Sequence, residues 1–167
     1  MKVFMIAAMS ADGYIGRDSN HLADWTGNED KKVFVRLTKA AGVMVMGART
    51  FGTIGRALPG RRTIVYTRHP ESIRAEGIEA TAEPPAELLE RLKREGANGV
   101  AICGGAATYD LFLQAGLIEE IYLTVEPVLF GSGVRLFNNP IEVPLKLLET
   151  TALSDNVLLL HYHVASV

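Results

Sequence analysis

The stretch that decides the fold is MVMGARTF at residues 44–51, followed by GRALPGRR at 55–62 and TIVY at 63–66. The apolar runs at its two ends are typical of buried strands, and we expect a helix between them that begins at Thr50. Gly47 lets the backbone approach a ligand, and the N–H groups in the first turn of a helix attract an anion. The order of strand, helix, turn and strand therefore predicts a unit with a ligand-binding edge.

Further strands and helices alternate along the chain. Short apolar runs rich in β-branched residues predict strands at 3–9, 43–46, 63–66, 100–103, 121–125 and 157–164. Apolar residues at helical spacing predict helices at 30–40, 85–95 and 106–115. Parallel strands need crossover connections, which helices usually supply, so we expect a three-layer α/β sandwich around a mostly parallel sheet. Since no convincing helix follows residue 121, the C-terminal strands should pair antiparallel at one edge, which makes the sheet mixed.

The composition is that of one ordinary globular domain. The chain has 167 residues, of which 48% are hydrophobic and 22% charged, and its net charge is −2. A chain of this size buries roughly 70% of the surface that its unfolded form exposes. Because it lacks the basic excess that nucleic acid or an anionic membrane would favour, the expected partner is a small molecule. We expect residues 1–167 to form a single domain, present as a monomer or a homodimer.

The cysteine content and the N-terminus favour a cytoplasmic protein. Cys103 is the only cysteine, so it cannot form an intramolecular disulfide, and its apolar neighbours indicate a buried side chain rather than a nucleophile. The apolar run at 2–9 is too short to span a bilayer, and SADG at 10–13 is no signal-peptide cleavage site. The four histidines show no metal-ligand spacing with acids or with Cys103, so we expect no metal.

An acid and an aromatic ring are expected on one face of the helix at 30–40. Phe34 follows Asp30 by four residues, which places both side chains on the same face. Taken alone, Asp30 is equally explained as an acid that favours the positive end of the helix dipole. Glu29 is the competing candidate, but it points about one hundred degrees away around the helix. We therefore prefer Asp30 as the functional acid.

These motifs closely resemble dihydrofolate reductase, and the resemblance extends over most of the chain. It is carried by residues 44–51, by LPGR at 58–61 and by WTGNEDKKVF at 25–34. The resemblance implies the fold of that family, single-domain and α/β. It also implies an enzyme that uses NADPH to reduce 7,8-dihydrofolate to 5,6,7,8-tetrahydrofolate, by hydride transfer to C6 of the pterin.

The resemblance implies catalytic roles for Asp30, Thr124 and Trp25. The matching acid in the family holds the 2-amino group and a ring nitrogen of the pterin, and Thr124 would orient it by a hydrogen bond. Without the resemblance, Thr124 is explained as an ordinary strand threonine. Burial in such a pocket should raise the pKa of the Asp30 carboxyl.

Further residues would bind the substrate. The implied substrate-binding residues are Ile6, Ala8, Phe34, Ile54, Leu58 and Arg61. The turn at 58–60 would present Arg61 at the edge of a cleft, where its planar guanidinium suits a carboxylate. In the family, the matching arginine holds the α-carboxylate of the glutamate tail of folate, and a sugar phosphate is the alternative ligand.

A second glycine motif predicts the cofactor site. GGAATY at 104–109 follows an apolar strand and opens a helix, so its N–H groups can meet a pyrophosphate. Alone, a Gly-Gly pair is usually a tight turn, but beside GART at 47–50 it would grip one dinucleotide between two neighbouring strand ends. The resemblance implies that the Gly104–Gly105 bond is cis. The implied cofactor-binding residues are Ala8, Ile15, Gly16, Gly47, Ala48, Arg49, Thr50, Thr67, Arg68, Cys103, Gly104, Gly105, Ala106, Ala107, Thr108 and Tyr109.

The chain departs from the family pattern at four positions, two of them in the cofactor site and two in the lid. Ala48 and Ala107 stand where many members carry arginine, so the grip on the 2′-phosphate of NADPH should fall mainly on Arg49 and Arg68. Residues 13–25 resemble the substrate lid of the family. However, a proline commonly precedes the tryptophan where this chain has Asp24, and the preceding Ala23 replaces a larger apolar residue.

Two other functions stay open. EPVLFGSGVRLF at 126–137 and SADG at 10–13 resemble the reductase domain of riboflavin biosynthesis, a 5-amino-6-(5-phosphoribosylamino)uracil reductase that also uses NADPH. Against it, the motifs at 25–34 and 58–61 fit a pterin that carries a glutamate. A nucleotide-binding regulatory domain would keep both glycine motifs without needing Asp30 and Thr124.

Overall fold

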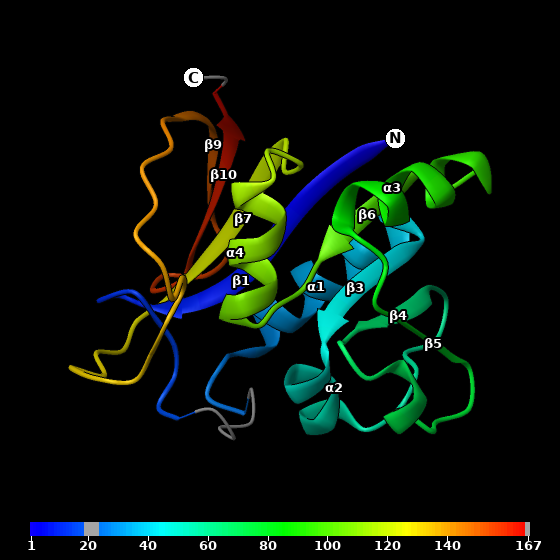
Figure 1. Ribbon diagram of the computed structural model, residues 1–167. Helices are drawn as coiled ribbons and strands as arrows, with labels where there is room; N and C mark the ends of the chain where they lie inside the picture. The colour runs from blue at the N-terminus through cyan, green and yellow to red at the C-terminus, as the bar shows by residue number, and fades with distance from the viewer. Residues whose placement is uncertain (19–23, 166–167) are drawn as a thin grey trace.

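The centre of the protein is an eight-stranded sheet. The computed structural model describes residues 1–18 and 24–165, and the strand order is β5-β4-β3-β6-β1-β7-β10-β9 (Figure 1). The strands are β1 (Lys2–Ser10), β3 (Val43–Gly47), β4 (Arg62–Tyr66), β5 (Ile78–Thr81), β6 (Gly99–Ile102), β7 (Glu120–Glu126), β9 (Leu145–Ala152) and β10 (Leu158–Val164). Two short strands, β2 (Tyr14–Gly16) and β8 (Val134–Arg135), form a separate antiparallel pair.

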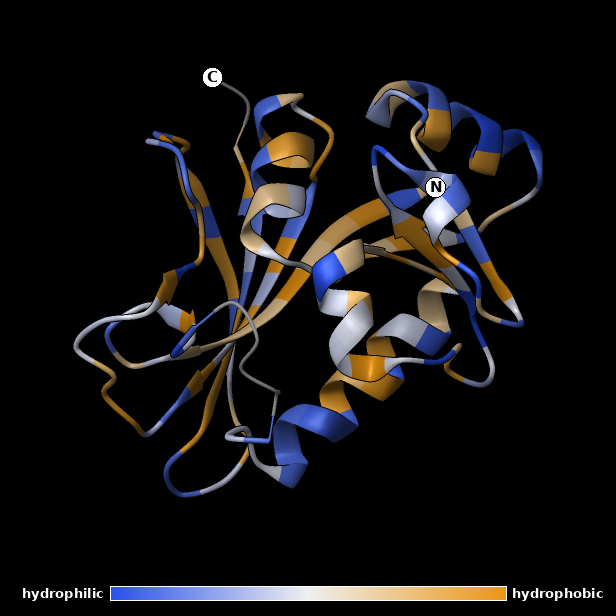
Figure 2. Ribbon diagram, turned by 60° about the horizontal axis from the view of Figure 1, so that its bottom comes forward, coloured by the Kyte–Doolittle hydropathy of each residue, from blue (hydrophilic) through white to orange (hydrophobic). Residues whose placement is uncertain are grey.

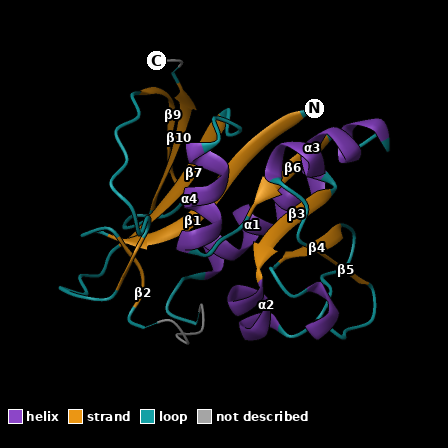
Figure 3. Cartoon of the chain, in the orientation of Figure 1, coloured by secondary structure: helices purple, strands orange, loops and turns teal. Residues whose placement is uncertain are grey.

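The sheet is mixed in the predicted way. Every pairing from β5 across to β7 is parallel. The last strand, β10, lies antiparallel to both β7 and β9, so the C-terminal hairpin forms one edge (Figure 3). The prediction of a mostly parallel sheet with an antiparallel C-terminal edge is confirmed.

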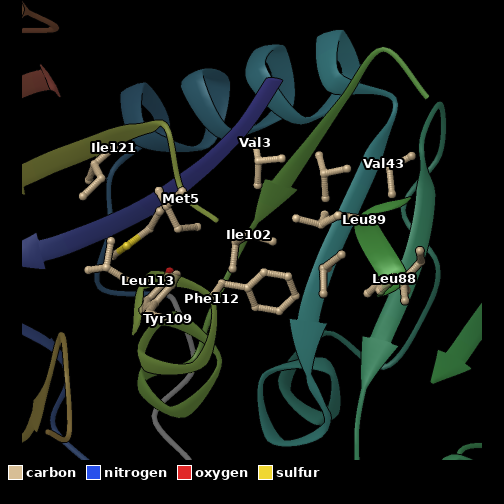
Figure 4. Close-up of a cluster of buried hydrophobic side chains, with 14 of the residues drawn as sticks. Val3, Met5, Val43, Leu88, Leu89, Ile102, Tyr109, Phe112, Leu113 and Ile121 are labelled. Atoms are coloured by element: carbon tan, nitrogen blue, oxygen red, sulfur yellow. The ribbon is translucent and has the colours of Figure 1, made fainter. Parts of the chain in front are cut away.

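Helices cover the two faces of this sheet. They are α1 (Asn28–Ala41), α2 (Ala48–Ile54), α3 (Pro85–Arg94) and α4 (Ala106–Gln114), with a 3-10 turn at Pro70–Ser72. Leu88 of α3 and Phe112 of α4 pack on one face of the sheet, where Val3 and Met5 belong to the same cluster (Figure 4). Successive residues of a strand point to opposite faces. Phe4 accordingly packs on the other face, against α1 and α2, and the three-layer prediction is confirmed.

Apolar and polar residues occupy different parts of the fold. The strands at the centre of the sheet consist largely of buried apolar residues, and polar residues gather on the outer surfaces of the helices and in the loops (Figure 2). In the part of the chain that the structure describes, no helix has both the length and the apolar character needed to cross a membrane.

Most predicted elements are present, with ends within two residues of the predicted ones. One helix start is wrong, because α2 begins at Ala48 instead of Thr50. Gly47 keeps an extended backbone, with φ −70° and ψ 159°, and the helix starts directly after it. The sequence patterns also missed β2, β5, β8 and β9, and the residues of β9 are almost all exposed at the sheet edge.

Candidate active site

A cleft of about 1020 Å³ opens at the carboxyl ends of the parallel strands. Its walls come from the ends of β1, β3, β4 and β6, from the first turns of α1, α2 and α4, and from the segment around β2. In open α/β sheets, ligands bind at this end of the strands. Of the predicted site residues, Thr124 and Arg61 lie beside the cleft, and the others line it.

Asp30 lies in the first turn of α1 and reaches the cleft half-buried. Its carboxylate accepts hydrogen bonds from the hydroxyls of Thr124 and Thr26. Burial raises the pKa of the Asp30 carboxyl above its ordinary value, although the two hydroxyls and the Lys31 cation oppose the shift. The result is an oriented carboxyl in a partly dry cleft, a group able to bind paired N–H donors of a ligand.

Thr124 reaches Asp30 from the sheet. It lies in β7 and is 1% exposed, opposite Ala8 of β1, which itself lines the cleft. Thr26 is a site residue that sequence reasoning missed, and it is also buried. Its position directly after Trp25, within the motif at 25–34, was the available signal.

The aromatic and cationic neighbours of Asp30 lie on one side of the cleft. Phe34 lines it with Asp30, whereas Glu29 is outside the lining among the described residues. The Arg61 guanidinium lies 5.9 Å from the centroid of the Phe34 ring and donates from Nη1 to the Pro59 carbonyl at 2.8 Å. Arg61 Nε is buried and has no hydrogen-bond partner within residues 1–18 and 24–165. This N–H is available to an anionic group of a ligand.

The two glycine motifs meet at neighbouring strand ends. Gly47 N–H donates to the Gly104 carbonyl at 2.7 Å, and the Gly104–Gly105 peptide bond is cis. A Cβ on Gly47 would lie 2.8 Å from Thr108 Oγ1, and one on Gly105 would lie 3.2 Å from Thr50 Oγ1. Glycine therefore keeps open a cradle between the first turns of α2 and α4, where backbone N–H groups can bind phosphate oxygens.

Other predicted residues surround this cradle. Arg49 and Arg68 are exposed at the rim, and Thr67 lies between Arg68 and the end of β4. The Cys103 sulfur contacts the Ala101 carbonyl, and burial raises the pKa of the Cys103 thiol. Cys103 lines the cleft, and a raised pKa disfavours the thiolate form that a nucleophile needs.

Tyr109 ties α4 to the sheet behind the cradle. Its hydroxyl donates to the Ile6 carbonyl at 2.7 Å, and burial raises the pKa of the phenol well above its ordinary value. Sequence reasoning missed several further lining residues, among them Tyr66, Leu111, Val134 and Asn138. No sequence motif indicated a role in the cleft for Val134 or Asn138. Val134 lies in β8, which pairs with β2, and the Asn138 N–H donates to Asp110 of α4 at 3.1 Å.

The structure describes part of residues 13–25, the segment predicted to form the substrate lid. Tyr14 and Gly16 pair with β8, while Ile15 and Trp25 line the cleft. Residues 19–23, including Ala23, where the chain departs from the family pattern, lie outside the described residues.

Comparison with known proteins identifies the family. The family model for dihydrofolate reductase matches residues 2–128. The chain belongs to the dihydrofolate reductase family. Within this family, it is 37% identical to dihydrofolate reductase type 3 of Salmonella typhimurium over 124 residues, 74% of this chain and 71% of that protein. It is 26% identical to an uncharacterized Bacillus subtilis protein over 145 residues, 82% of this chain and 83% of that protein.

Solved structures share the dihydrofolate reductase fold with this chain. Dihydrofolate reductase from Enterococcus faecalis, complexed with NADP(H), superposes with a TM-score of 0.80 at 24% identity, covering 99% of this chain and 97% of that one. A putative riboflavin biosynthesis protein from Shewanella sp. PV-4 gives 0.84 at 23% identity, covering 99% and 100%. At these identities the likeness concerns the fold alone. Membership of the dihydrofolate reductase family supports an oxidoreductase.

Proposed function

We propose that the protein reduces 7,8-dihydrofolate to 5,6,7,8-tetrahydrofolate with NADPH. The observation that carries this proposal is the Asp30 carboxylate, which Thr124 and Thr26 orient beside Phe34 in the cleft. Two carboxylate oxygens match the paired N–H donors of a pterin, the 2-amino group and the adjacent ring nitrogen. The fold alone would not justify this choice, because the same scaffold hosts different substrates.

The walls around Asp30 suit a flat, apolar ring. Ile6, Ala8, Phe34, Ile54 and Leu58 line that part of the cleft. Arg61 binds the carboxylate of the glutamate tail in this proposal. Its buried Nε–H lacks a partner among the described residues, and a carboxylate would accept a hydrogen bond from it. Asp30 sets the polarity and tautomer of the pterin, while a water, rather than Asp30 itself, delivers the proton to N5.

The residues at the other end of the cleft fit a dinucleotide phosphate. A Cβ would crowd Thr108 at Gly47 and pack tightly against Thr50 at Gly105, and the first turns of α2 and α4 aim backbone N–H groups at this cradle. Ile15, Gly16, Ala106, Ala107 and Tyr109 complete this part of the lining. When bound there, NADPH supplies the hydride for C6 of the pterin.

The preference for NADPH over NADH is a separate hypothesis. Arg49 and Arg68 are the cations expected at the 2′-phosphate, because Ala48 and Ala107 cannot bind it. We expect the kcat/KM for NADPH to exceed that for NADH. In the Arg68→Ala variant, the ratio of the NADPH value to the NADH value should be smaller than in wild type. Equal kcat/KM values for the two cofactors in the wild-type protein would reject the hypothesis.

A riboflavin-type pyrimidine reductase is the second candidate. A specific observation favours it: the segment after β7 packs on residues 10–13, where the Asp12 carboxylate accepts hydrogen bonds from the N–H groups of Phe130 and Gly131 at 3.1 Å and 2.8 Å. Both segments carry the motifs that resemble the riboflavin-pathway domain. Against it, that substrate carries a phosphate in place of a glutamate and does not call for a pterin-binding acid.

A substrate panel separates these functions. Purified protein is given NADPH with dihydrofolate or with the ribosylaminopyrimidine phosphate, and the loss of reduced-nicotinamide absorbance is followed, with methotrexate as a blocking control. Methotrexate-sensitive oxidation with dihydrofolate, with tetrahydrofolate as product, supports the proposal. Turnover of the pyrimidine alone supports the second candidate, and NADPH binding without turnover indicates a regulatory role.

A further inference from the structure

We propose that residues 126–131, the platform that begins at the last residue of β7, position both ends of the stretch from Trp25 to Asp30, with Glu126 and Phe130 as positioning residues. The contacts of the platform are independent of the reaction. Its effect on turnover rests on the proposed function, so the test below includes a measurement that needs no turnover.

Glu126 holds the first turn of α1. It is the last residue of β7 and is only 4% exposed, and its Oε1 accepts a hydrogen bond from Gly27 N–H at 3.2 Å. Gly27 is the N-cap residue of α1 and has no side chain that could cap the helix. The Glu126 carboxylate accepts the N–H of Gly27 itself, as a first-turn glutamate does in a capping box, and the positive end of the helix dipole favours a negative charge there.

Glu126 and Thr124 act on the same helix turn. They lie two residues apart in β7, so both side chains point to the same face of the sheet. Thr124 holds the Asp30 carboxylate, and Glu126 holds the backbone three residues before it. A buried carboxylate is costly unless it is hydrogen-bonded, so the Glu126 contact fixes the helix start rather than merely touching it.

Phe130 holds the other end of the stretch. Its ring lies 5.0 Å from the Trp25 ring, centroid to centroid, in an edge arrangement at 68°. The Arg17 guanidinium lies over the same Phe130 ring at 5.2 Å. Trp25 lines the cleft, whereas Phe130 is outside the lining among the described residues. Phe130 therefore acts on the site through the orientation of the indole.

The platform is itself anchored to the turn after β1. Asp12 accepts hydrogen bonds from the backbone N–H groups of Phe130, at 3.1 Å, and Gly131, at 2.8 Å. The Ser10 hydroxyl donates to the same carboxylate at 2.7 Å. Ala11 N–H adds a bond to the Val128 carbonyl at 2.8 Å. With its backbone held at Val128, Phe130 and Gly131, the platform can transmit the position of β1 and β7 to Trp25 and Asp30.

The first arm of the test measures steady-state kinetics. A displacement of about 1 Å near the reacting groups costs about 100-fold in rate, so we expect Glu126→Ala and Phe130→Ala each to lower kcat by about 10- to 100-fold. The KM for NADPH should change by less than about twofold, because the glycine cradle is untouched. Glu126→Gln keeps an oxygen acceptor and Phe130→Tyr keeps the ring, so both should retain most of the activity.

The second arm uses fluorescence. Trp25 is the only tryptophan of the chain, so its emission maximum and its quenching by acrylamide report the indole directly. We expect Phe130→Ala to shift the emission and raise the quenching, and Glu126→Ala to do so to a smaller extent. Leu129→Ala is the matched control, since that neighbouring side chain is 72% exposed. It should behave as wild type in both arms.

The outcomes separate the two proposals. The proposed role of the platform is wrong if Phe130→Ala and Glu126→Ala have the same emission and the same kcat as Leu129→Ala. It is also wrong if NADPH affinity is lost in step with kcat, because that pattern indicates general disruption. If wild-type protein does not reduce dihydrofolate, the proposed function fails, and the fluorescence arm still decides the platform. If Glu126→Ala does not fold, the comparison of Phe130→Ala with Phe130→Tyr decides it.

Discussion

The Thr124 hydroxyl donates a hydrogen bond to the Asp30 carboxylate, which joins strand β7 to the first turn of α1. Thr26 donates to the same carboxylate from the segment just before the helix. Strand β7 therefore orients the Asp30 carboxyl, the first turn of α1 carries it, and the cleft wall buries part of it. This relationship makes Asp30 more than a residue that favours the helix dipole, because a carboxyl used only in that way would have no need of two buried hydroxyls.

Removing the Thr124 hydroxyl should change the pH dependence of activity. The hydrogen bond lowers the pKa of Asp30 against the effect of burial, so Thr124→Val should raise that pKa further. The acid limb of kcat/KM for dihydrofolate should move to higher pH, as initial rates across a pH series would record. Thr63→Val is the control, because the buried Thr63 hydroxyl has no partner among the described residues. An unmoved acid limb in Thr124→Val would contradict the role of this bond.

A methyl group at Gly47 should close the phosphate cradle. The new Cβ would lie 2.8 Å from Thr108 Oγ1, although the Gly47 backbone angles are open to alanine. Overpacking costs about 1–3 kcal/mol, so Gly47→Ala should weaken NADPH binding by about tenfold or more. Adding Thr108→Ala should restore part of the affinity.

The control for this prediction is Gly52→Ala in α2, where a new Cβ would meet nothing within 4 Å. Isothermal titration with NADPH measures the three variants and the wild type. If Gly47→Ala binds NADPH as tightly as Gly52→Ala does, the cofactor phosphates do not lie in this cradle.

Arg61→Leu should weaken the binding of the substrate and leave the binding of the cofactor unchanged. Loss of a charge pair from a partly buried site costs about 2–4 kcal/mol, and the Arg61 guanidinium lies beside the Phe34 ring, away from the glycine cradle. The KM for dihydrofolate should rise steeply, with NADPH binding unchanged. Arg56→Leu, at an exposed position after α2, serves as the control. An unaltered KM in Arg61→Leu would show that the glutamate tail binds elsewhere.

An ion-pair network outside the cleft lining should control acid stability. Arg91 donates to Glu83 from Nε at 2.9 Å and from Nη2 at 2.7 Å, and this pairing lowers the pKa of Glu83 to about 2. Because the folded-state pKa is lowered from 4.5, the stabilisation is complete above about pH 4.5 and is lost as the pH falls toward 2.

The Glu83→Gln variant tests this stabilisation. Its free energy of unfolding should lie below that of wild type near neutral pH, and the two should converge in acid, as urea denaturation at several pH values would measure. Glu90→Gln, an exposed neighbour on α3, should follow wild type throughout. A constant difference between Glu83→Gln and wild type at every pH would disprove the linkage.

Local sequence patterns predicted the parts of the fold that are buried. The β-branched runs of β3, β4 and β6 are buried on both faces of a parallel sheet, so their apolar character is continuous and easily recognised. The edge strand β9 has no such constraint, since its residues are exposed, and it remained undetected. The start of α2 was misplaced because a glycine in extended conformation can end a strand and cap a helix at once.

The residues of the candidate site also divide into those that a local sequence pattern indicates and those that only the fold brings together. Asp30 and Phe34 were recognisable from helical spacing, and the two glycine motifs from their places after strands. Glu126 was not recognisable, because its partner Gly27 is 99 residues away in the sequence. A contact of this kind depends on the pairing of β7 with β1 and on the packing of α1 against the sheet, which no local pattern records.

The rate of NADPH oxidation with dihydrofolate in Asp30→Asn, beside wild type and Glu29→Gln, decides whether Asp30 is the functional acid. We expect methotrexate-sensitive turnover in wild type and in Glu29→Gln. We expect Asp30→Asn to lose several orders of magnitude in turnover at neutral pH, with NADPH binding nearly intact. Near-normal turnover in Asp30→Asn, with a collapse in Glu29→Gln, would contradict this role of Asp30 and would assign the acid to Glu29.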